Sequence, residues 1–243
     1  SLQGINPSGK PISSGEGGVA CTHSRLYYQK MLAYCHLHRK GLQKELEGSP
    51  FSVLDGEVLG LKWRPHPLAM AIGLISLKSV DERNRKKEQC YERTAAILSE
   101  FDFIQMPTIH AHCRMSGFYG GIKIIYAPEH FGNIAVTALV NALASEGVPI
   151  TGPSVGYLEY RRTIMQHGFD LYGKGRGPLK ASWNGLEAYK GTKREDFPIS
   201  ERMNDRVLTL PCFIDVEEGY YTALKAAFAK IRAHRDLIPQ VHP

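Results

Sequence analysis

A segment in which one lysine lies among glycine, serine and proline residues opens the sequence. This segment, residues 1–18, holds Lys10 and leads into the apolar stretch Val19–Thr22. Glycine adopts backbone conformations that a Cβ forbids, and free N–H and hydroxyl groups can hold an anion. A desolvated lysine in such a setting can react with a carbonyl carbon. The pattern indicates a cofactor site, while a plain turn is the alternative that the residues alone leave open.

The composition indicates a globular protein with a sizeable core. The chain has 243 residues, of which 43% are hydrophobic, enough for one large domain or two small ones. Its uninterrupted apolar runs are shorter than the roughly 18 residues that suggest a membrane span, and no charged-then-apolar leader is recognisable. We therefore expect a soluble, cytoplasmic protein without a membrane partner.

The net charge of +6 permits nucleic-acid binding without requiring it. Basic residues are spread along the chain with acidic residues between them, and no RNA- or DNA-binding motif accompanies them. The run Arg83–Lys87 is typical of a solvated helix face. We expect no nucleic-acid partner, and a positive field can instead steer an anionic cofactor or a nucleotide-linked substrate inward.

Cysteine and histidine spacing predicts neither disulfides nor a metal site. The cysteines are odd in number and scattered without a Cys-x-x-Cys pair, so we expect reduced thiols. Two histidine pairs, His36 with His38 and His110 with His112, lack a recognisable third ligand, so no metal is predicted.

Apolar residues at helical spacing predict two long helices in the first part of the chain. The first covers residues 25–46, with Ser24 as its N-cap. The second begins at Pro67, which suits a first helical turn, and continues to a break near Met106. Its expected apolar positions are Leu68, Ile72, Ile75, Tyr91, Ala95 and Leu98.

The second part of the chain has mixed strand and helix signals. Residues 117–126 and 148–151 are predicted strands, and residues 134–145 between them a predicted helix. This order favours an α/β or α+β layer. Residues 152–206 are rich in glycine and proline and are expected to be irregular, as functional or mobile loops are. An amphipathic helix is predicted over residues 217–234, with Tyr221, Leu224, Phe228 and Ile231 on its buried stripe.

The lysine segment is similar to one in a known family. The run Lys10-x-x-x-x-Gly15-Glu16-Gly17-Gly18 resembles the lysine segment of the DegT/StrS family of pyridoxal-phosphate-dependent sugar aminotransferases, which have fold type I. The resemblance covers essentially the whole chain. Its further motifs are Leu59–Arg64, Pro67–Ala69, Phe197-Pro198-x-x-Glu201 and Leu208–Pro211.

The resemblance implies roles for four residues. Lys10 occupies the position of the lysine that holds pyridoxal 5′-phosphate as an internal aldimine and then moves a proton between the amino donor and the cofactor. The serine that binds the phosphate corresponds to Ser1 or Ser8, and we favour Ser1 because a strand is expected to start there. Lys62 replaces an asparagine that reaches the phosphate of the neighbouring subunit's cofactor, which a lysine can do as a point charge. A surface lysine is the alternative for Lys62.

The fold implied by the resemblance is α/β, as the C-terminal part of a fold-type-I transferase. Residues 1–23 would be the cofactor-lysine segment of the large domain, residues 24–106 the connecting helices, and residues 107–243 a small C-terminal α+β domain. In the family, the large domain also supplies groups that pair with the pyridine nitrogen and cover the ring. Those groups do not precede Lys10 in this sequence.

We therefore expect the N-terminal half of the enzyme to come from a separate subunit, a processed precursor or residues omitted from a shortened chain. A split enzyme, assembled as a dimer of such pairs, is the interpretation that we favour. The expected reaction moves an amino group from an amino-acid donor to a ketone on a sugar, cyclitol or similar polyol. The alternative is a non-catalytic scaffold or regulatory subunit. Related sugar dehydratases have histidine at the position of Lys10, so the lysine argues against that branch.

Overall fold

The structure is a computed structural model with two compact units, residues 1–85 and residues 86–243. The structure describes residues 2–4, 11–15, 17–35, 42–54, 65–113, 120–153, 158–167 and 191–238.

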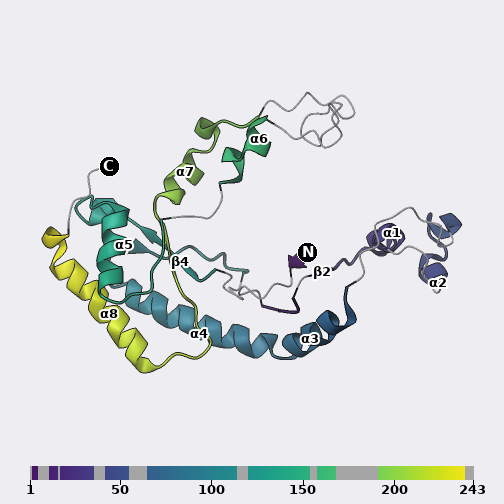
Figure 1. The fold of residues 1–243 in the computed structure, drawn as a ribbon, viewed down its shortest axis with the longest axis horizontal. Coiled ribbons are helices and arrows are strands. Elements are labelled where there is room, and N and C mark those ends of the chain that lie inside the picture. Colours follow the sequence, from purple (N-terminus) through teal and green to yellow (C-terminus); the bar gives the residue numbers. More distant parts are fainter. Residues whose placement is uncertain are drawn as a thin grey trace. The chain divides into compact units, whose positions relative to one another are not determined.

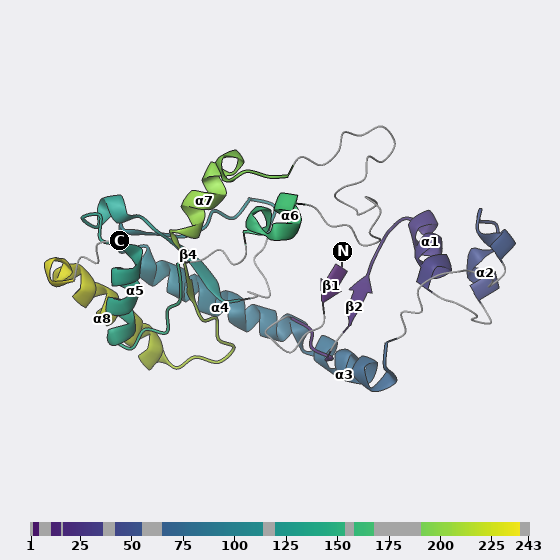
Figure 2. The ribbon, with the colours of Figure 1, turned by 45° about the horizontal axis from the view of Figure 1, so that its top comes forward.

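The described residues of the first unit include a two-stranded sheet and three complete α-helices. Strand β1 (Leu2–Gly4) pairs antiparallel with β2 (Gly18–Ala20), as Figure 2 shows. The helices are α1 (Arg25–Cys35), α2 (Leu42–Leu46) and α3 (Pro67–Lys78). A small apolar cluster packs α1 against α2, with Ala33 and Leu46 buried at its centre.

Two helices occupy the region where the sequence predicts one. Helix α3 begins with Pro67 in its first turn, after His66 accepts a hydrogen bond from the N–H of Leu68 at 3.2 Å. The helix ends at Lys78 with Ser79 as its C-cap, and α4 (Val80–Leu98) follows directly. Asp81 and Glu82 lie in the first turn of α4, where the helix dipole favours negative charge. The prediction of an uninterrupted helix from Pro67 to a break near residue 106 is therefore wrong, because α3 ends at Lys78 and a second helix covers Val80–Leu98.

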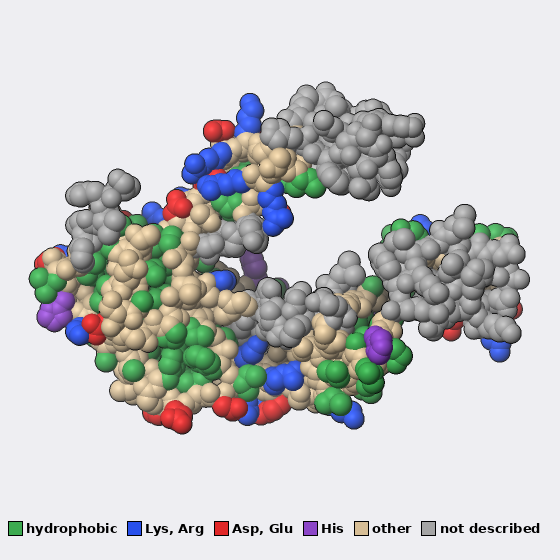
Figure 3. Space-filling view, in the orientation of Figure 1, with side chains coloured by type: hydrophobic (Ala, Val, Ile, Leu, Met, Phe, Trp, Pro, Cys, Tyr) green, Lys and Arg blue, Asp and Glu red, His purple; other side chains and the backbone are tan. Residues whose placement is uncertain are grey.

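The predicted apolar stripe is buried on α4 but not on α3. Tyr91 and Leu98 are buried, whereas Leu68, Ile72 and Ile75 are 68%, 55% and 69% exposed. Figure 3 shows hydrophobic side chains of α3 at the surface of the molecule. Apolar residues at helical spacing are therefore buried on α4 and exposed on α3.

The second unit is built on a three-stranded antiparallel sheet in the order β3–β4–β5. The strands are β3 (Ile104–Gln105), β4 (Ile122–Tyr126) and β5 (Val207–Leu210). Ile122, Ile124 and Tyr126 alternate along β4 and are each fully buried, as expected for one face of a strand. Helices α4, α5 (Val136–Ser145) and α8 (Glu218–Ala233) contribute side chains to the core beside this sheet (Figure 1).

Aromatic rings fill the centre of this core. Phe228 of α8 lies 5.5 Å from Phe101 and 6.3 Å from Phe103, measured between ring centroids. Phe103 also stacks on Phe131 at 4.2 Å. The hydroxyl of Tyr126 donates a 2.8 Å hydrogen bond to a main-chain carbonyl oxygen, so its burial leaves no unpaired polar atom.

The helix predictions for this unit are confirmed, and one strand prediction is wrong. Helices α5 and α8 lie within the predicted ranges, and the predicted stripe of α8 is buried. Residues 148–151 form no strand and pair with β5 only through a single bridge from Thr151 to Thr209. Pro153 follows closely, and proline has no N–H with which to extend a ladder. The strand predicted over residues 117–126 corresponds to β4, which begins at Ile122.

The region predicted to be irregular contains short helices. Helix α6 (Thr163–His167) and helix α7 (Pro198–Asn204) lie side by side (Figure 2). Pro198 occupies the first turn of α7, where its missing N–H costs nothing. Proline in this region therefore marks a helix start at Pro198.

Candidate functional site

The paired strands β1 and β2 close the loop that contains Lys10. Their antiparallel register runs from Leu2 opposite Ala20 to Gly4 opposite Gly18. The two ends of the segment between the strands are therefore held next to each other. Lys10 belongs to this loop by sequence.

Directly after Lys10, the loop is anchored to α3 and α4 by a guanidinium group. Nη2 of Arg83 donates a 2.5 Å hydrogen bond to the carbonyl oxygen of Pro11. The same nitrogen donates to the carbonyl oxygen and to Oγ of Ser76, both at 3.1 Å. The N–H of Ser13 donates to the same Oγ at 3.1 Å. Hydrogen bonds from charged donors contribute about 1.5–3 kcal/mol each, so the peptide next to Lys10 is held firmly.

The next loop residue, Ser14, is buried against α3. Its side chain is 2% exposed, and a Cβ added at Gly73 would lie 3.2 Å from the Cβ of Ser14. The missing side chain at Gly73 thus lets the loop approach the helix closely. No hydrogen-bond partner of Ser14 Oγ lies among the residues that the structure describes. Gly15 then turns the chain with φ +81°, a conformation that glycine adopts without strain.

The structure corrects the expectation that Arg83–Lys87 is a solvated helix face. Arg83 is partly buried and, besides its contacts to the loop, its Nη1 donates to Oγ of Ser79 at 2.7 Å. Arg85 does behave as expected, since it is exposed and pairs with Glu82 on the same helix at 2.7 Å. Burial of Arg83 follows from its position near the junction of the two helices, which the sequence did not reveal.

The four residues to which the resemblance gave roles lie outside the described residues. They are Lys10, Ser1, Ser8 and Lys62. Their mutual geometry therefore stays a prediction. What the structure adds is the set of residues that hold the loop, Arg83, Ser76, Ser14 and Gly73, none of which was selected from the sequence.

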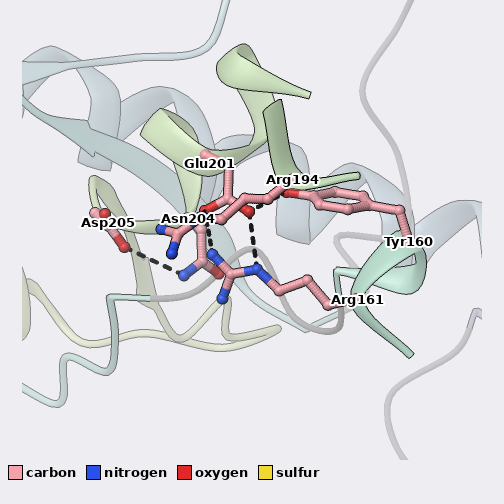
Figure 4. A network of polar contacts seen from close by, with 6 residues as sticks. All are labelled: Tyr160, Arg161, Arg194, Glu201, Asn204 and Asp205. Carbon is pink, nitrogen blue, oxygen red and sulfur yellow. Dashed lines mark hydrogen bonds and ion pairs between the residues drawn. The ribbon is translucent and has the colours of Figure 1, made fainter. Parts of the chain in front are cut away.

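A second polar cluster is centred on Glu201 of α7 (Figure 4). Its Oε1 accepts 2.8 Å hydrogen bonds from the hydroxyl of Tyr160 and from Nε of Arg161. Its Oε2 accepts from Arg161 as well, and from Nε of Arg194 at 2.7 Å. The ring of Tyr160 stacks on Phe197, with 4.2 Å between centroids.

The charges around Glu201 stabilise its ionised form. Hydrogen bonds from Arg161 lower the pKa of Glu201 to about 2, with smaller contributions from Tyr160 and Arg194, against an opposing effect of desolvation. Burial, and then the neighbouring Glu201, raise the pKa of Tyr160. Both carboxylate oxygens of Glu201 accept hydrogen bonds from arginine or tyrosine side chains. The role of Glu201 is therefore structural, because it holds these side chains together. The motif Phe197-Pro198-x-x-Glu201 thus supplies the helix start, the stacked ring and the carboxylate of one cluster.

Other candidate sites gain no support within the described residues. No group of three or more His, Cys, Asp or Glu side chains is placed there to hold a metal ion. His110 and His112 are both exposed, while His36 and His38 lie outside the described residues. The cysteines whose side chains are described form no disulfide with one another; they are Cys21, Cys90, Cys113 and Cys212. In the described part of the chain, none of the helices has the length and apolar character needed to cross a membrane.

Solved structures share the fold of this chain. An aminotransferase from Psychrobacter cryohalolentis matches with a TM-score of 0.61 and 15% identity, covering 93% of this chain and 54% of its own. A DegT DnrJ EryC1 StrS aminotransferase from Brucella abortus matches with 0.61 and 16%, covering 95% and 50%. The E. coli GDP-4-keto-6-deoxy-D-mannose-3-dehydratase with bound hydrated PLP matches with 0.62 and 16%, covering 89% and 51%. The chain spans about half the length of these proteins and has the mixed α/β fold of part of them.

The family follows from the sequence match. Residues 7–153 match the model of the DegT/DnrJ/EryC1/StrS aminotransferase family, which is more than half of the chain. The chain therefore belongs to this family. No curated protein sequence matches it significantly.

Proposed function

We propose that this chain provides the cofactor-lysine portion of a pyridoxal-phosphate-dependent aminotransferase. The observation that carries the proposal is the loop of Lys10, closed by β1 and β2 and anchored at Pro11 by Arg83. Membership of an aminotransferase family supports this class of activity. A dehydratase of similar fold holds PLP, which supports the choice of cofactor.

The groups that this chain supplies fit pyridoxal phosphate. Lys10 offers an amine for the aldehyde carbon, and Ser1, Ser8 and Lys62 offer hydroxyl and cationic groups for the phosphate. The buried Oγ of Ser14, which has no hydrogen-bond partner among the described residues, is a further polar atom in the same loop. When bound, the cofactor supplies an electron sink for the substrate carbon.

The proposed tasks of this chain's residues are to bind and orient the cofactor and to move a proton. Lys10 would hold the cofactor through its amine, and the same amine would move a proton between the donor's Cα and the cofactor's C4′ atom. Ser1, with Ser8 as the alternative, would bind the phosphate. Lys62 would contact the phosphate of a neighbouring subunit's cofactor as a point charge.

The proposed substrates are an amino-acid donor and a polyhydroxylated ketone. A ketone on a sugar or cyclitol accepts the amino group, as the names of family relatives suggest; sugar aminotransferase CalS13 from Micromonospora echinospora has a similar fold. Lys10 favours amino transfer over dehydration, because the lysine amine is the group that exchanges with the amino donor.

The remaining half of the site is proposed to come from residues outside this sequence, as an N-terminal half on a separate subunit. The apolar surface of α3 supports this arrangement. Exposed apolar side chains that gather on one helix mark an interaction site. These are Leu68, Ile72, Leu74, Ile75 and Leu77, each at least half exposed. A dimer of such pairs would then complete each site, with residues 1–23 in the large domain, 24–106 as connecting helices and 107–243 as the small domain.

Substitution of Lys10 tests the proposed function. In the assembled enzyme, Lys10→Ala should lower turnover of amino donor by at least about 10²–10⁴-fold, the usual contribution of a proton-transferring group. Lys78→Ala is the matched control, since Lys78 is exposed at the end of α3 and should leave turnover unchanged. Turnover of the Lys10→Ala variant at the wild-type rate would instead indicate a scaffold subunit.

A further inference from the structure

We infer that Arg83 is a positioning residue that fixes where Lys10 presents its amine. The inference rests on the proposed function, because it assigns a role in the same reaction. Arg83 contacts the loop at Pro11, the residue bonded directly to Lys10. No contact of Arg83 with cofactor or substrate is required.

The covalent link from Pro11 to Lys10 makes this contact effective. The peptide bond between them is planar, and the proline ring fixes φ of Pro11. Proline also restricts the backbone of the residue before it. Holding the carbonyl oxygen of Pro11 therefore limits the positions that the Lys10 main chain can take.

Two helices define the position of the anchor itself. Arg83 belongs to the first turns of α4, and Ser76 to the last turns of α3. The Oγ of Ser76 accepts hydrogen bonds from both Arg83 and the N–H of Ser13, so loop and guanidinium share one acceptor. Ser14 fits against Gly73 one helical turn earlier on α3. Three residues of the loop, Pro11, Ser13 and Ser14, thus contact the two helices.

Small displacements of a reacting group are costly in catalysis. A misplacement of about 1 Å can lower a rate by about 10²-fold. A guanidinium spans several acceptors with a planar fork, whereas a lysine ammonium is a single point charge. Loss of Arg83 should therefore lower kcat more than it raises KM, and Arg83→Lys should restore only part of the loss.

The first measurement follows the loop without any cofactor. Hydrogen exchange of the full chain should be at least tenfold faster at the amide of Ser13 in Arg83→Met than in the wild-type protein. Arg85→Met is the matched control on the same helix, because Arg85 pairs only with Glu82 among the contacts described for it. Unchanged hydrogen exchange at Ser13 in Arg83→Met would contradict the claim that Arg83 holds the loop in place.

The second measurement uses the assembled enzyme with pyridoxal phosphate. Arg83→Met should lower kcat by about 10²-fold with a smaller change in KM, and Arg83→Lys should recover part of kcat. Borohydride reduction should label Lys10 more slowly in Arg83→Met than in Arg85→Met. Equal labelling and equal kcat in these two variants would overturn the inference alone. Absence of label from Lys10 in the wild-type enzyme would overturn the proposed function, and with it this role of Arg83.

Discussion

Arg83 and Pro11 are 72 positions apart in the sequence, yet Nη2 of Arg83 lies 2.5 Å from the carbonyl oxygen of Pro11. This hydrogen bond joins the loop of the candidate lysine to the start of a long helix. It makes the arginine, which by sequence belongs to a basic run, part of the support of the proposed site.

Acid should weaken the polar cluster centred on Glu201. Its pKa is about 2 in the folded protein against an ordinary value of 4.5, so the ionised form stabilises the folded state above about pH 4.5. That stabilisation is lost progressively as the pH falls from 4.5 toward 2. The variant Glu201→Gln should unfold at a lower temperature than wild type at neutral pH, and the difference should shrink over this acidic range.

The control for this prediction is Glu159→Gln, which removes an exposed carboxylate that pairs with Arg162. Surface pairs of this kind contribute little, so its unfolding temperature should stay close to that of wild type. A Glu201→Gln deficit as large at pH 2 as at neutral pH would contradict the account.

Alanine at Gly121 should disrupt the start of β4. The φ of Gly121 is +90°, and a Cβ there would lie 2.3 Å from the carbonyl oxygen of Leu210 in β5. Gly121→Ala should lower the free energy of unfolding by more than about 2 kcal/mol. Gly219→Ala is the control, since that position in α8 has open space and alanine should raise the free energy by up to about 1 kcal/mol. Similar denaturation curves for the two variants would be evidence against this packing.

A charge on the exposed face of α3 should prevent association with the proposed N-terminal half. Ile75 is 69% exposed, so Ile75→Asp should leave the unfolding temperature of the isolated chain nearly unchanged. Association should weaken by more than about tenfold, because burying an unpaired carboxylate is costly. Ile199→Asp is the matched control, at 67% exposure on α7. Native mass measurements that show equal association of both variants would rule out α3 as the contact surface.

Helices α5 and α8 and strand β4 of the second unit were predicted from the sequence, whereas strands β3 and β5 were not. The stripe of α8, from Tyr221 to Ile231, has strict helical spacing and is buried as expected. Local periodicity was misleading on α3, whose apolar residues are exposed in this chain. Periodicity identifies an apolar face but does not say whether the same chain covers it. The prediction of a strand at residues 148–151 was wrong for a related reason. Whether a segment joins a sheet depends on pairing with a strand that is distant in the sequence, and only Thr151 pairs with β5.

The supports of the candidate site were harder to predict. Lys10 is recognisable from its glycine-rich run, but Arg83 resembles any basic residue on a solvated helix. One signal was present in the sequence: Gly73 and Ser76 interrupt an otherwise apolar helix at a spacing of one turn. Such small residues mark a place where another backbone approaches closely. Only the three-dimensional structure shows that this backbone is the loop after Lys10.

The most direct test of the account is to find which lysine binds the cofactor. The assembled enzyme is incubated with pyridoxal phosphate, reduced with borohydride, digested and mapped by mass spectrometry. We expect one labelled site, Lys10, and no label at that position in Lys10→Ala. A label on Lys62 or another lysine in place of Lys10, or an active enzyme that carries no label, would contradict it.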